Sequence, residues 1–333
     1  MISGEYVVLD GAVALVAAAD ARAFVRWVVD RDGSPLVAHG SPGSALLPRE
    51  VLLTRTLAEA FTSMSPSTDS LTLDVSALRR DGRKLGLGSS AAAAAATAGA
   101  VFARAGRRLD DDAERRAMLA IALEGHRSVA PEGSGADVAA SVLGGLVRFR
   151  RDAESGAVLE ASAVSFPVGT AVRVVWTGHE ARTSELVRKV RALLETDRAA
   201  YERAMGALRD AATQLVEAVA ANDAHALVRA ASVHHDAMGK LGEAASAPIV
   251  DAGLARAAAL ARAHGGAAKP SGAGGGDVAL AFFADQDAAK KFAAACPANA
   301  LTLVDVALGV EGVRQEAMPS VMLNSAAHSK IDS

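Results

Sequence analysis

The chain has 333 residues, with 35 lysine and arginine residues against 38 aspartate and glutamate residues, and a single cysteine. This length is sufficient for two domains, and the net charge of −3 gives no basic excess for binding nucleic acid. One cysteine excludes an internal disulfide framework and fits a reducing cytoplasm, and no apolar run reaches the roughly 18 residues of a membrane helix. We therefore expect a soluble cytoplasmic enzyme that binds neither nucleic acid nor a membrane.

The first part of the chain is predicted to contain mainly strands. Its short apolar runs are separated by turn residues, and Asp10-Gly11 is a strong hairpin signal between two of them. A later segment has apolar residues at helical spacing, and the next one alternates as a strand does. The predicted elements are strands at 6–9, 12–18, 21–29 and 70–74 and an amphipathic helix at 49–63.

The next segment reads KLGLGSSAAAAAA. Alanine is the best helix former, so we expect a helix over 91–104 with Ser89 or Ser90 as its N-cap. The N-terminus of a helix offers unpaired N–H donors and partial positive charge, and Gly86 and Gly88 let the backbone approach a ligand closely. The segment is therefore predicted to be a phosphate cradle.

Two other kinds of glycine loop fit this segment less well. The Walker A pattern requires a lysine directly after its last glycine, whereas Ser89 follows Gly88 here. The spacing Gly86-x-Gly88-x-x-Ala91 matches the looser dinucleotide fingerprint, but charged residues rather than a hydrophobic strand precede it. A glycine turn that caps an ordinary helix is the simplest alternative.

The second half of the chain is predicted to be mainly helical up to residue 264, with strands before and after. The boundary between halves is expected near Phe166-Pro167. We expect domains at 1–166 and 167–318 and a disordered tail at 319–333. The predicted strands are 146–150, 157–164, 171–176, 278–283 and 301–306, and the predicted helices are 112–128, 184–195, 198–220, 225–240, 250–264 and 288–295.

Three motifs occur in order along the chain: SGEYVVLDGAVALV at 3–16, GLGSSAA at 86–92 and KPSGAGGGD at 269–277. Together they resemble the motifs of the GHMP small-molecule kinases, and the resemblance covers nearly the whole chain. It implies an α+β protein with the two-domain GHMP kinase fold. The implied parts are an N-terminal nucleotide-binding α/β domain and a C-terminal ferredoxin-like α+β domain, with the site in the cleft between them.

Three further features resemble one branch of this family, the phosphomevalonate kinases. They are GSGADVAASVLGG at 133–145, WTGHEARTSELVRKV at 176–190, and Asp277. This resemblance implies transfer of the γ-phosphoryl group of ATP to 5-phosphomevalonate, with ATP and Mg²⁺ as cofactors and a small molecule as the partner of a monomer or homodimer. Two alternatives stay open: phosphorylation of mevalonate or another alcohol by a GHMP kinase, and a non-catalytic relative that only binds ligand.

The resemblance also implies roles for individual residues. Asp137 is the implied base or electrostatic anchor at the acceptor, although an Asp after Gly is often only a helix cap. Lys84 is the implied catalytic cation, although it could be a solvated lysine beside three arginines. The implied nucleotide-binding residues are Gly86, Leu87, Gly88, Ser89, Ser90 and Ala91. The implied substrate-binding residues are Ser134, Gly135, Ser184, Ser271, Gly272, Ala273 and Gly274, and the implied metal ligands are Ser90 and Glu124.

The sequence departs from the family pattern in two places. The family usually carries Pro-Gly-Lys in a strand shortly before GEY, whereas this sequence reads Met1-Ile2-Ser3-Gly4. Either that strand lies upstream or the site lacks that lysine, and Glu5-Tyr6 is still expected to line the substrate pocket. His126 stands where mevalonate kinases carry Glu, and Mg²⁺ prefers oxygen ligands, which argues against a mevalonate kinase. Arg182 and Lys189 are expected near the substrate.

Overall fold

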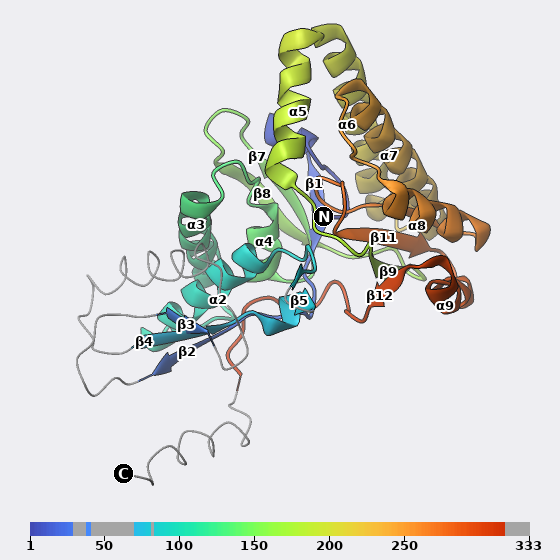
Figure 1. Cartoon of the computed structure of the whole chain (residues 1–333). Coiled ribbons are helices and arrows are strands. Elements are labelled where there is room, and N and C mark those ends of the chain that lie inside the picture. The colour runs from blue at the N-terminus through green and yellow to red at the C-terminus, as the bar shows by residue number, and fades with distance from the viewer. Residues whose placement is uncertain (29–37, 41–69, 81–82, 317–333) are drawn as a thin grey trace, which may run out of the picture.

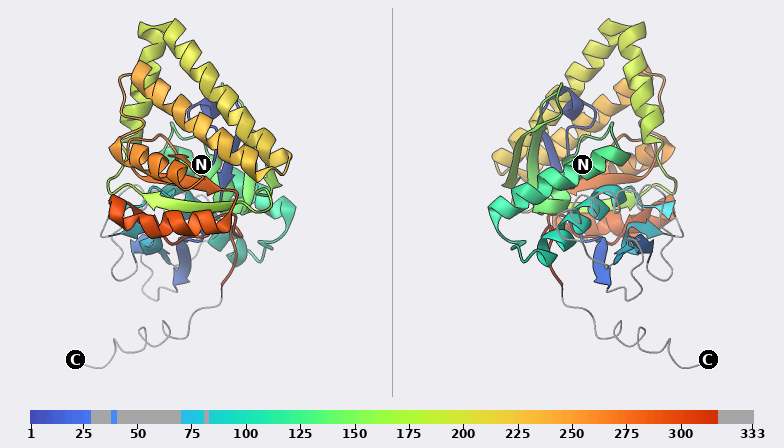
Figure 2. Two further views of the ribbon diagram at one scale, coloured as in Figure 1. Left: turned by 90° about the vertical axis from the view of Figure 1, so that its right-hand side faces the viewer. Right: turned by 90° about the vertical axis from the view of Figure 1, so that its left-hand side faces the viewer.

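The computed structural model describes residues 1–28, 38–40, 70–80 and 83–316. The helix predicted at 49–63 and the tail predicted at 319–333 lie outside these ranges. In the described part, two halves meet around the N-terminal segment, whose end lies near the middle of the molecule in every view (Figures 1 and 2). No helix within the described ranges is long and apolar enough to cross a membrane.

In the first half, three helices pack against a three-stranded antiparallel sheet (Figure 1). These elements are α2 (Ser89–Arg104), α3 (Asp112–Val129), α4 (Ala136–Leu143), β1 (Ala14–Ala17), β7 (Leu146–Arg151) and β8 (Val158–Val164). The strands lie in the order β1-β7-β8, with Val16 opposite Val147. Ala94 and Ala98 of α2 are fully buried, and such small side chains let the three helices pack closely.

A smaller sheet lies below α2 in Figure 1. In it β2 (Phe24–Val28) pairs antiparallel with β4 (Ser70–Asp74), which pairs parallel with β3 (Ala38–Gly40). The indole N–H of Trp27 donates to the Ala100 carbonyl at 2.9 Å and fixes β2 on α2. The chain then forms a 3-10 turn, η2 (Ser76–Leu78), and a short antiparallel pair of strands, β5 (Arg79–Arg80) and β6 (Arg83–Lys84). The predicted phosphate cradle follows directly.

The second half is a four-stranded antiparallel sheet with helices on both faces (Figures 1 and 2). The strands, in spatial order, are β10 (Ala267–Pro270), β11 (Val278–Phe283), β9 (Ala171–Trp176) and β12 (Thr302–Val304). The helices are α5 (Thr183–Thr196), α6 (Arg198–Ala220), α7 (Ala224–Ala244), α8 (Ala252–Ala263), α9 (Gln286–Ala295) and the 3-10 turn η3 (Pro297–Asn299).

Strand β11 is buried on both faces, which explains its unbroken apolar sequence VALAFF. Because side chains alternate along a strand, Val278, Leu280 and Phe282 pack with α6 and α7. Ala279, Ala281 and Phe283, on the opposite face, pack with α8 and α9. The strand therefore forms the centre of the second half, and the glycine-rich loop before it starts from a rigid base.

One hydrophobic core spans both halves. Ile2 and Leu15 of the first half pack in the same cluster as Leu280 of the second. The chain also returns to the first half after β12, where isolated bridges join Ala19 to Leu308 and Gly144 to Glu311. This shared core fixes the position of the two halves relative to each other.

The strand predicted at 6–9 is wrong. The segment forms a 3-10 turn, η1 (Val7–Asp10), preceded by Tyr6 with φ +60° and followed by Gly11 with φ +80°. Tyr6 and Val7 bury their side chains against α6 and α7, so their apolar character does not require a strand. β1 pairs with β7, and Asp10-Gly11 therefore does not close a hairpin. The other predicted elements within the described ranges are present, with ends shifted by at most a few residues.

Candidate active site

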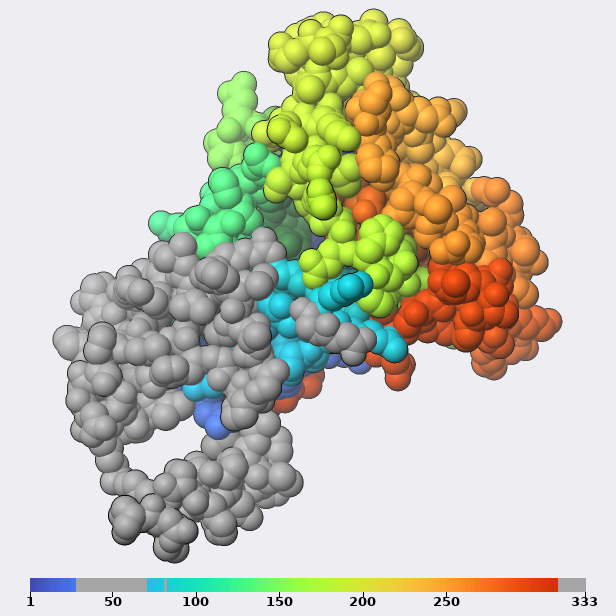
Figure 3. Space-filling model, viewed as in Figure 1, coloured from blue at the N-terminus to red at the C-terminus, as the bar shows by residue number. Residues whose placement is uncertain are grey.

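A cavity of about 1290 Å³ lies where the two halves meet. In Figure 3 the surface is hollowed where the green, yellow-green and cyan parts of the chain adjoin. The lining comes from the N-terminal segment, the cradle, the start of α4, the start of α5 and the loop between β10 and β11. The sequence-predicted residues in this lining are Lys84, Gly86, Leu87, Gly88, Ser89, Ser90, Ser134, Asp137, Ser184, Ser271, Gly272 and Ala273, together with Glu5 and Tyr6.

Three of the residues predicted to bind ligand lie behind the cavity rather than in its lining. Ala91 is fully buried in the core of the first half. Gly135 and Gly274 form turns with φ of +82° and +76°. A Cβ at Gly274 would lie 2.2 Å from the Ile249 carbonyl oxygen, so this glycine serves close backbone packing.

The loop before α2 passes close to the candidate catalytic carboxylate. Gly86 and Gly88 have φ of +71° and +78°, and Gly88 is the N-cap of α2. A Cβ at Gly88 would lie 3.6 Å from the Cβ of Asp137. The prediction of a serine N-cap is wrong, because a left-handed glycine turns the chain into the helix here and Ser89 and Ser90 are already helical.

The starts of α2 and α5 differ from those of most other helices. Five helices in the described ranges, α3, α6, α7, α8 and α9, have an Asp N-cap whose carboxylate accepts hydrogen bonds from first-turn N–H groups. The N-cap of α4 is Gly135, but the Ser134 hydroxyl and the Asp137 carboxylate accept hydrogen bonds from its first-turn N–H groups. The N-caps of α2 and α5 are Gly88 and Arg182, and neither side chain caps its helix. Both first turns line the cavity, through Ser89-Ser90 and Thr183-Ser184. Two helix N-termini that offer N–H groups to one cavity suit two anionic groups.

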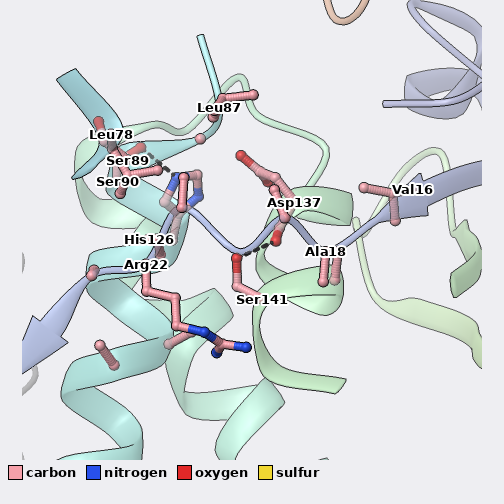
Figure 4. A pocket seen from close by; sticks show the side chains of 18 of the residues that line it. Val16, Ala18, Arg22, Leu78, Leu87, Ser89, Ser90, His126, Asp137 and Ser141 are labelled. Carbon is pink, nitrogen blue, oxygen red and sulfur yellow. Dashed lines mark hydrogen bonds between the residues drawn. The ribbon is translucent and has the colours of Figure 1, made fainter. Parts of the chain in front are cut away.

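Asp137 lies in the first turn of α4, across the pocket from Ser90 (Figure 4). Its Oδ1 accepts a hydrogen bond from the Val138 N–H at 3.0 Å, and its carbonyl accepts one from the Ser141 hydroxyl at 2.9 Å. The start of a helix stabilises a negative charge. The carboxylate is therefore fixed in direction beside the cradle, as an electrostatic anchor requires.

The oxygen ligands that could hold a metal are limited. The Ser90 hydroxyl lies 3.1 Å from Nε2 of His126, which is 4% exposed (Figure 4). Glu124, the other predicted ligand, is exposed on α3 and does not line the cavity. No three His, Cys, Asp or Glu side chains within the described ranges form a metal site of their own. A Mg²⁺ ion carried by phosphates needs only one or two protein ligands, so the Ser90 hydroxyl and the Asp137 carboxylate fit such an ion.

The glycine loop, residues 271–276, is held by the N-terminal segment. The Tyr6 hydroxyl donates to the Ala273 carbonyl at 2.6 Å, and the Ser271 hydroxyl donates to the Met1 carbonyl at 3.1 Å. Burial raises the pKa of Tyr6, and Glu5 adds to this effect, so the tyrosine keeps the proton that it donates. The loop is thereby fixed at both its first and its third residue.

A buried charge cluster that sequence reasoning missed lies beneath this loop. Lys269 Nζ lies 2.6 Å from Glu5 Oε1 and donates to the Pro270 carbonyl at 2.7 Å. Nε2 of His234 lies 3.2 Å from Glu5 Oε2, and all three side chains are at most 1% exposed. The spacing of His234 with Ala230 and Leu241 places it on the buried face of α7, which a helical wheel would have indicated.

The charges in this cluster follow from burial and mutual attraction. Burial acts to raise the pKa of Glu5, but the neighbouring positive charges, that of Lys269 above all, outweigh it and the pKa is lowered. Burial lowers the pKa of His234 to about 3, against the attraction of Glu5. We therefore assign an ion pair of Glu5 with Lys269 beside a neutral His234.

Acid should destabilise the fold through His234. The unfolded chain takes up a proton near the ordinary pKa of 6.5, whereas the folded His234 takes it up only near 3. Unfolding therefore binds a proton between these values, and the free energy of unfolding should fall by up to about 1.4 kcal/mol per pH unit as the pH decreases. Urea unfolding at several pH values measures this slope. His234→Gln should flatten it, while the exposed control His225→Gln should not; equal slopes in all three proteins would show that His234 is not the group responsible.

Comparison with known proteins identifies the family. The profile for the GHMP kinases N terminal domain matches residues 59–145, and the profile for the GHMP kinases C terminal domain matches residues 215–300. Phosphomevalonate kinase of Streptomyces sp. (strain CL190) is 31% identical over 280 residues, which are 77% of this chain and 73% of that protein. The chain belongs to the GHMP kinase family and is a phosphotransferase.

Solved structures share its fold. Streptococcus pneumoniae phosphomevalonate kinase in complex with phosphomevalonate and AMPPNP has a TM-score of 0.74 and 20% identity, covering 92% of this chain and 96% of that one. L. major mevalonate kinase in complex with R-mevalonate has a TM-score of 0.71 and 20% identity, covering 94% of each chain. The expected α+β GHMP kinase fold is confirmed.

Proposed function

We propose that this kinase transfers the γ-phosphoryl group of ATP to the phosphate of 5-phosphomevalonate, giving ADP and 5-diphosphomevalonate. The observation that carries the proposal is the pair of uncapped helix starts, α2 and α5, in one cavity. The acceptor phosphate needs an anion site in addition to the one that binds the ATP phosphates, and the start of α5 can supply it. The 31% identity to a phosphomevalonate kinase supports the same acceptor.

The donor phosphates are assigned to the cradle. The first residues of α2 line the cavity, and Gly88, which has no Cβ, leaves space for phosphate against the backbone. The space beside Gly86 is taken by the side chain of Asp277. Lys84, whose side chain is part of the cavity lining, supplies positive charge at the loop. Ser90 and Asp137 would hold Mg²⁺, which neutralises charge on the donor phosphates.

The acceptor phosphate is assigned to the start of α5. Ser134, Ser184 and Ser271 line this part of the cavity. The hydroxyls of Ser134 and Ser184 can donate to phosphate oxygens, whereas the hydroxyl of Ser271 donates to the Met1 carbonyl. Arg182 and Lys189, the expected cations, are outside the lining, and both pair with Glu185. Helix N–H groups and hydroxyls therefore take the larger part in binding the phosphate.

Asp137 has a positioning and electrostatic role in this reaction. A phosphate acceptor is already ionised at neutral pH, so a strong base is not required to create the nucleophile. Phosphoryl transfer depends mainly on holding the two groups in line and balancing charge. The fixed carboxylate of Asp137 beside Gly88 suits that task.

Gly88→Val should abolish binding of a non-hydrolysable ATP analogue, measured by titration calorimetry. The branched side chain cannot adopt the left-handed conformation of Gly88 without strain, and it would fill the space assigned to phosphate. Gly106→Val is the matched control, because Gly106 has φ +71° but no atom within 4 Å of its would-be Cβ. Comparable loss of analogue binding in both variants would contradict the assignment of the cradle.

The proposed reaction is tested by ADP release with ATP and Mg²⁺, offering phosphomevalonate and mevalonate separately. We expect release with phosphomevalonate and only background with mevalonate. Turnover of mevalonate alone would agree with the assignment of the cradle but would contradict phosphomevalonate as the acceptor. Binding of the ATP analogue without turnover of either acceptor would favour a ligand-binding relative or another acceptor.

A further inference from the structure

Asp277 has an unusual backbone conformation at the end of the glycine loop. Its φ is +54°, in the left-handed region that residues with a Cβ adopt at a cost. The next residue begins β11, which is buried on both faces. A glycine would fit this backbone without strain, and four of the six preceding loop residues are glycine. The side chain of Asp277 must therefore contribute something that offsets the strain.

The first contribution is to the loop after β9, residues 177–181. The Asp277 carbonyl accepts hydrogen bonds from the Thr177 N–H at 2.9 Å and from the Thr177 hydroxyl at 3.0 Å. The Asp277 N–H donates to the His179 carbonyl at 2.8 Å. Its side-chain Oδ1 accepts from the Ala181 N–H at 3.1 Å. The residue thus joins the end of the glycine loop to the chain that leads into α5.

The second contribution is to the cradle in the other half of the molecule. A Cβ at Gly86 would lie 2.4 Å from the Cβ of Asp277 and 2.9 Å from its Oδ2, so this side chain rests directly on Gly86. Close by, Glu180 Oε1 accepts a hydrogen bond from the Lys84 N–H at 2.5 Å. Through these two contacts, the loop after β9 and the glycine loop pack against the chain just before α2.

We propose that Asp277 is a positioning residue that fixes the phosphate cradle relative to the glycine loop and the start of α5. The proposal rests on the proposed function, because it concerns the alignment of the two anion sites assigned there. Its contact with Gly86 fixes the position of the first anion site, at the start of α2. Its hydrogen bond with the Ala181 N–H fixes the chain that leads into α5, where the second anion site lies. In this role the shape and the acceptor oxygen of the side chain matter, and its charge does not.

Two substitutions separate these contributions. Asp277→Gly relieves the backbone strain but removes the contact with Gly86 and the bond to Ala181. Asp277→Asn keeps the volume and an acceptor oxygen, tolerates the left-handed conformation and removes the charge. Three quantities are measured for each protein: the melting temperature, the Kd of a non-hydrolysable ATP analogue, and kcat with KM for phosphomevalonate.

Asp277→Gly should melt no lower than the parent protein, yet bind the analogue on the order of tenfold more weakly, because the cradle must then be ordered on binding. Its kcat/KM should fall by about 10²-fold through misalignment of the two substrates. Asp277→Asn should stay near the parent in all three measurements. A lower kcat of Asp277→Asn with unchanged melting would overturn the proposal, because the charge itself would then act in the reaction.

The remaining outcomes are also decisive. Asp277→Gly with unchanged analogue binding and kcat/KM would overturn the proposal, and so would an Asp277→Gly protein that unfolds, since the contact would then serve stability alone. Analogue binding is read without an acceptor, so it tests Asp277 even where phosphomevalonate is not turned over. A parent protein that fails to bind the analogue would contradict the proposed function and with it this inference.

Discussion

Asp137→Asn is expected to lower kcat by about 10²–10³-fold, the range typical of losing one preorganised electrostatic group at a reaction centre. The amide has the same shape, and its oxygen can still accept the hydrogen bond from the Val138 N–H, so α4 should begin as before. What is lost is the negative charge beside Gly88 and Ser90. ADP release under saturating ATP and acceptor measures the effect.

Two further measurements make this result specific to the site. The Kd of a non-hydrolysable ATP analogue, measured without Mg²⁺, should change little, because the N–H groups of α2 do not depend on Asp137. Asp112→Asn is the matched control, since Asp112 is an exposed carboxylate in the first turn of α3. Near-parental turnover by Asp137→Asn would remove this residue from the reaction, and an equal loss in both variants would show a general effect on folding.

Lys269→Met is expected to lower the free energy of unfolding by about 3–5 kcal/mol, because it leaves the carboxylate of Glu5 buried without its partner. The double variant Glu5→Gln/Lys269→Met removes both charges and should recover most of this loss. Chemical denaturation of the parent, the two single variants and the double variant measures the coupling between the residues. Additive losses would show that the two side chains do not form an ion pair.

The exposed pair of Lys290 with Asp287 serves as the control for this experiment. Its nitrogen–oxygen distance of 2.9 Å is close to that of the buried pair, but both side chains are at least 71% exposed. Lys290→Met should therefore cost little stability, because water screens an exposed pair. The contrast isolates burial as the source of the large effect, because the chemistry of the two pairs is the same.

The buried pair also has a consequence for activity. Lys269 donates to the Pro270 carbonyl directly before the glycine loop, and Glu5 precedes Tyr6, which holds Ala273. The N-terminal segment and the glycine loop are therefore one packed unit. This explains how a loop so rich in glycine can keep a defined shape at the substrate site.

The local features of the site were predictable from the sequence. The paired glycines before an alanine-rich run predicted a glycine turn followed by a helix, because helix propensity and glycine freedom act over a few residues. The periodicity of α6 gave its bounds without error, since its apolar face is continuous. The N-cap of α2 was missed because a serine at this position suits a cap and a helical first turn equally well.

The contacts made over long sequence separations were not predictable. Glu5 and Lys269 are 264 positions apart, and no local pattern pairs them. The contact of Asp277 with Gly86 likewise depends on how the two halves pack. Val7 and Val8 suggested a strand because the composition did not reveal the left-handed Tyr6 before them. In each case tertiary packing, rather than local propensity, decides the structure.

In the proposed reaction a phosphate, and not a hydroxyl group, accepts the phosphoryl group. Phosphorus NMR of a reaction with ATP, Mg²⁺ and phosphomevalonate tests this most directly. We predict that the monoester resonance of phosphomevalonate is replaced by two mutually coupled diphosphate resonances distinct from those of ADP. A second monoester resonance would show transfer to a hydroxyl group and would contradict the assignment of the acceptor phosphate to the reaction centre, and an unchanged spectrum would contradict the proposed reaction altogether.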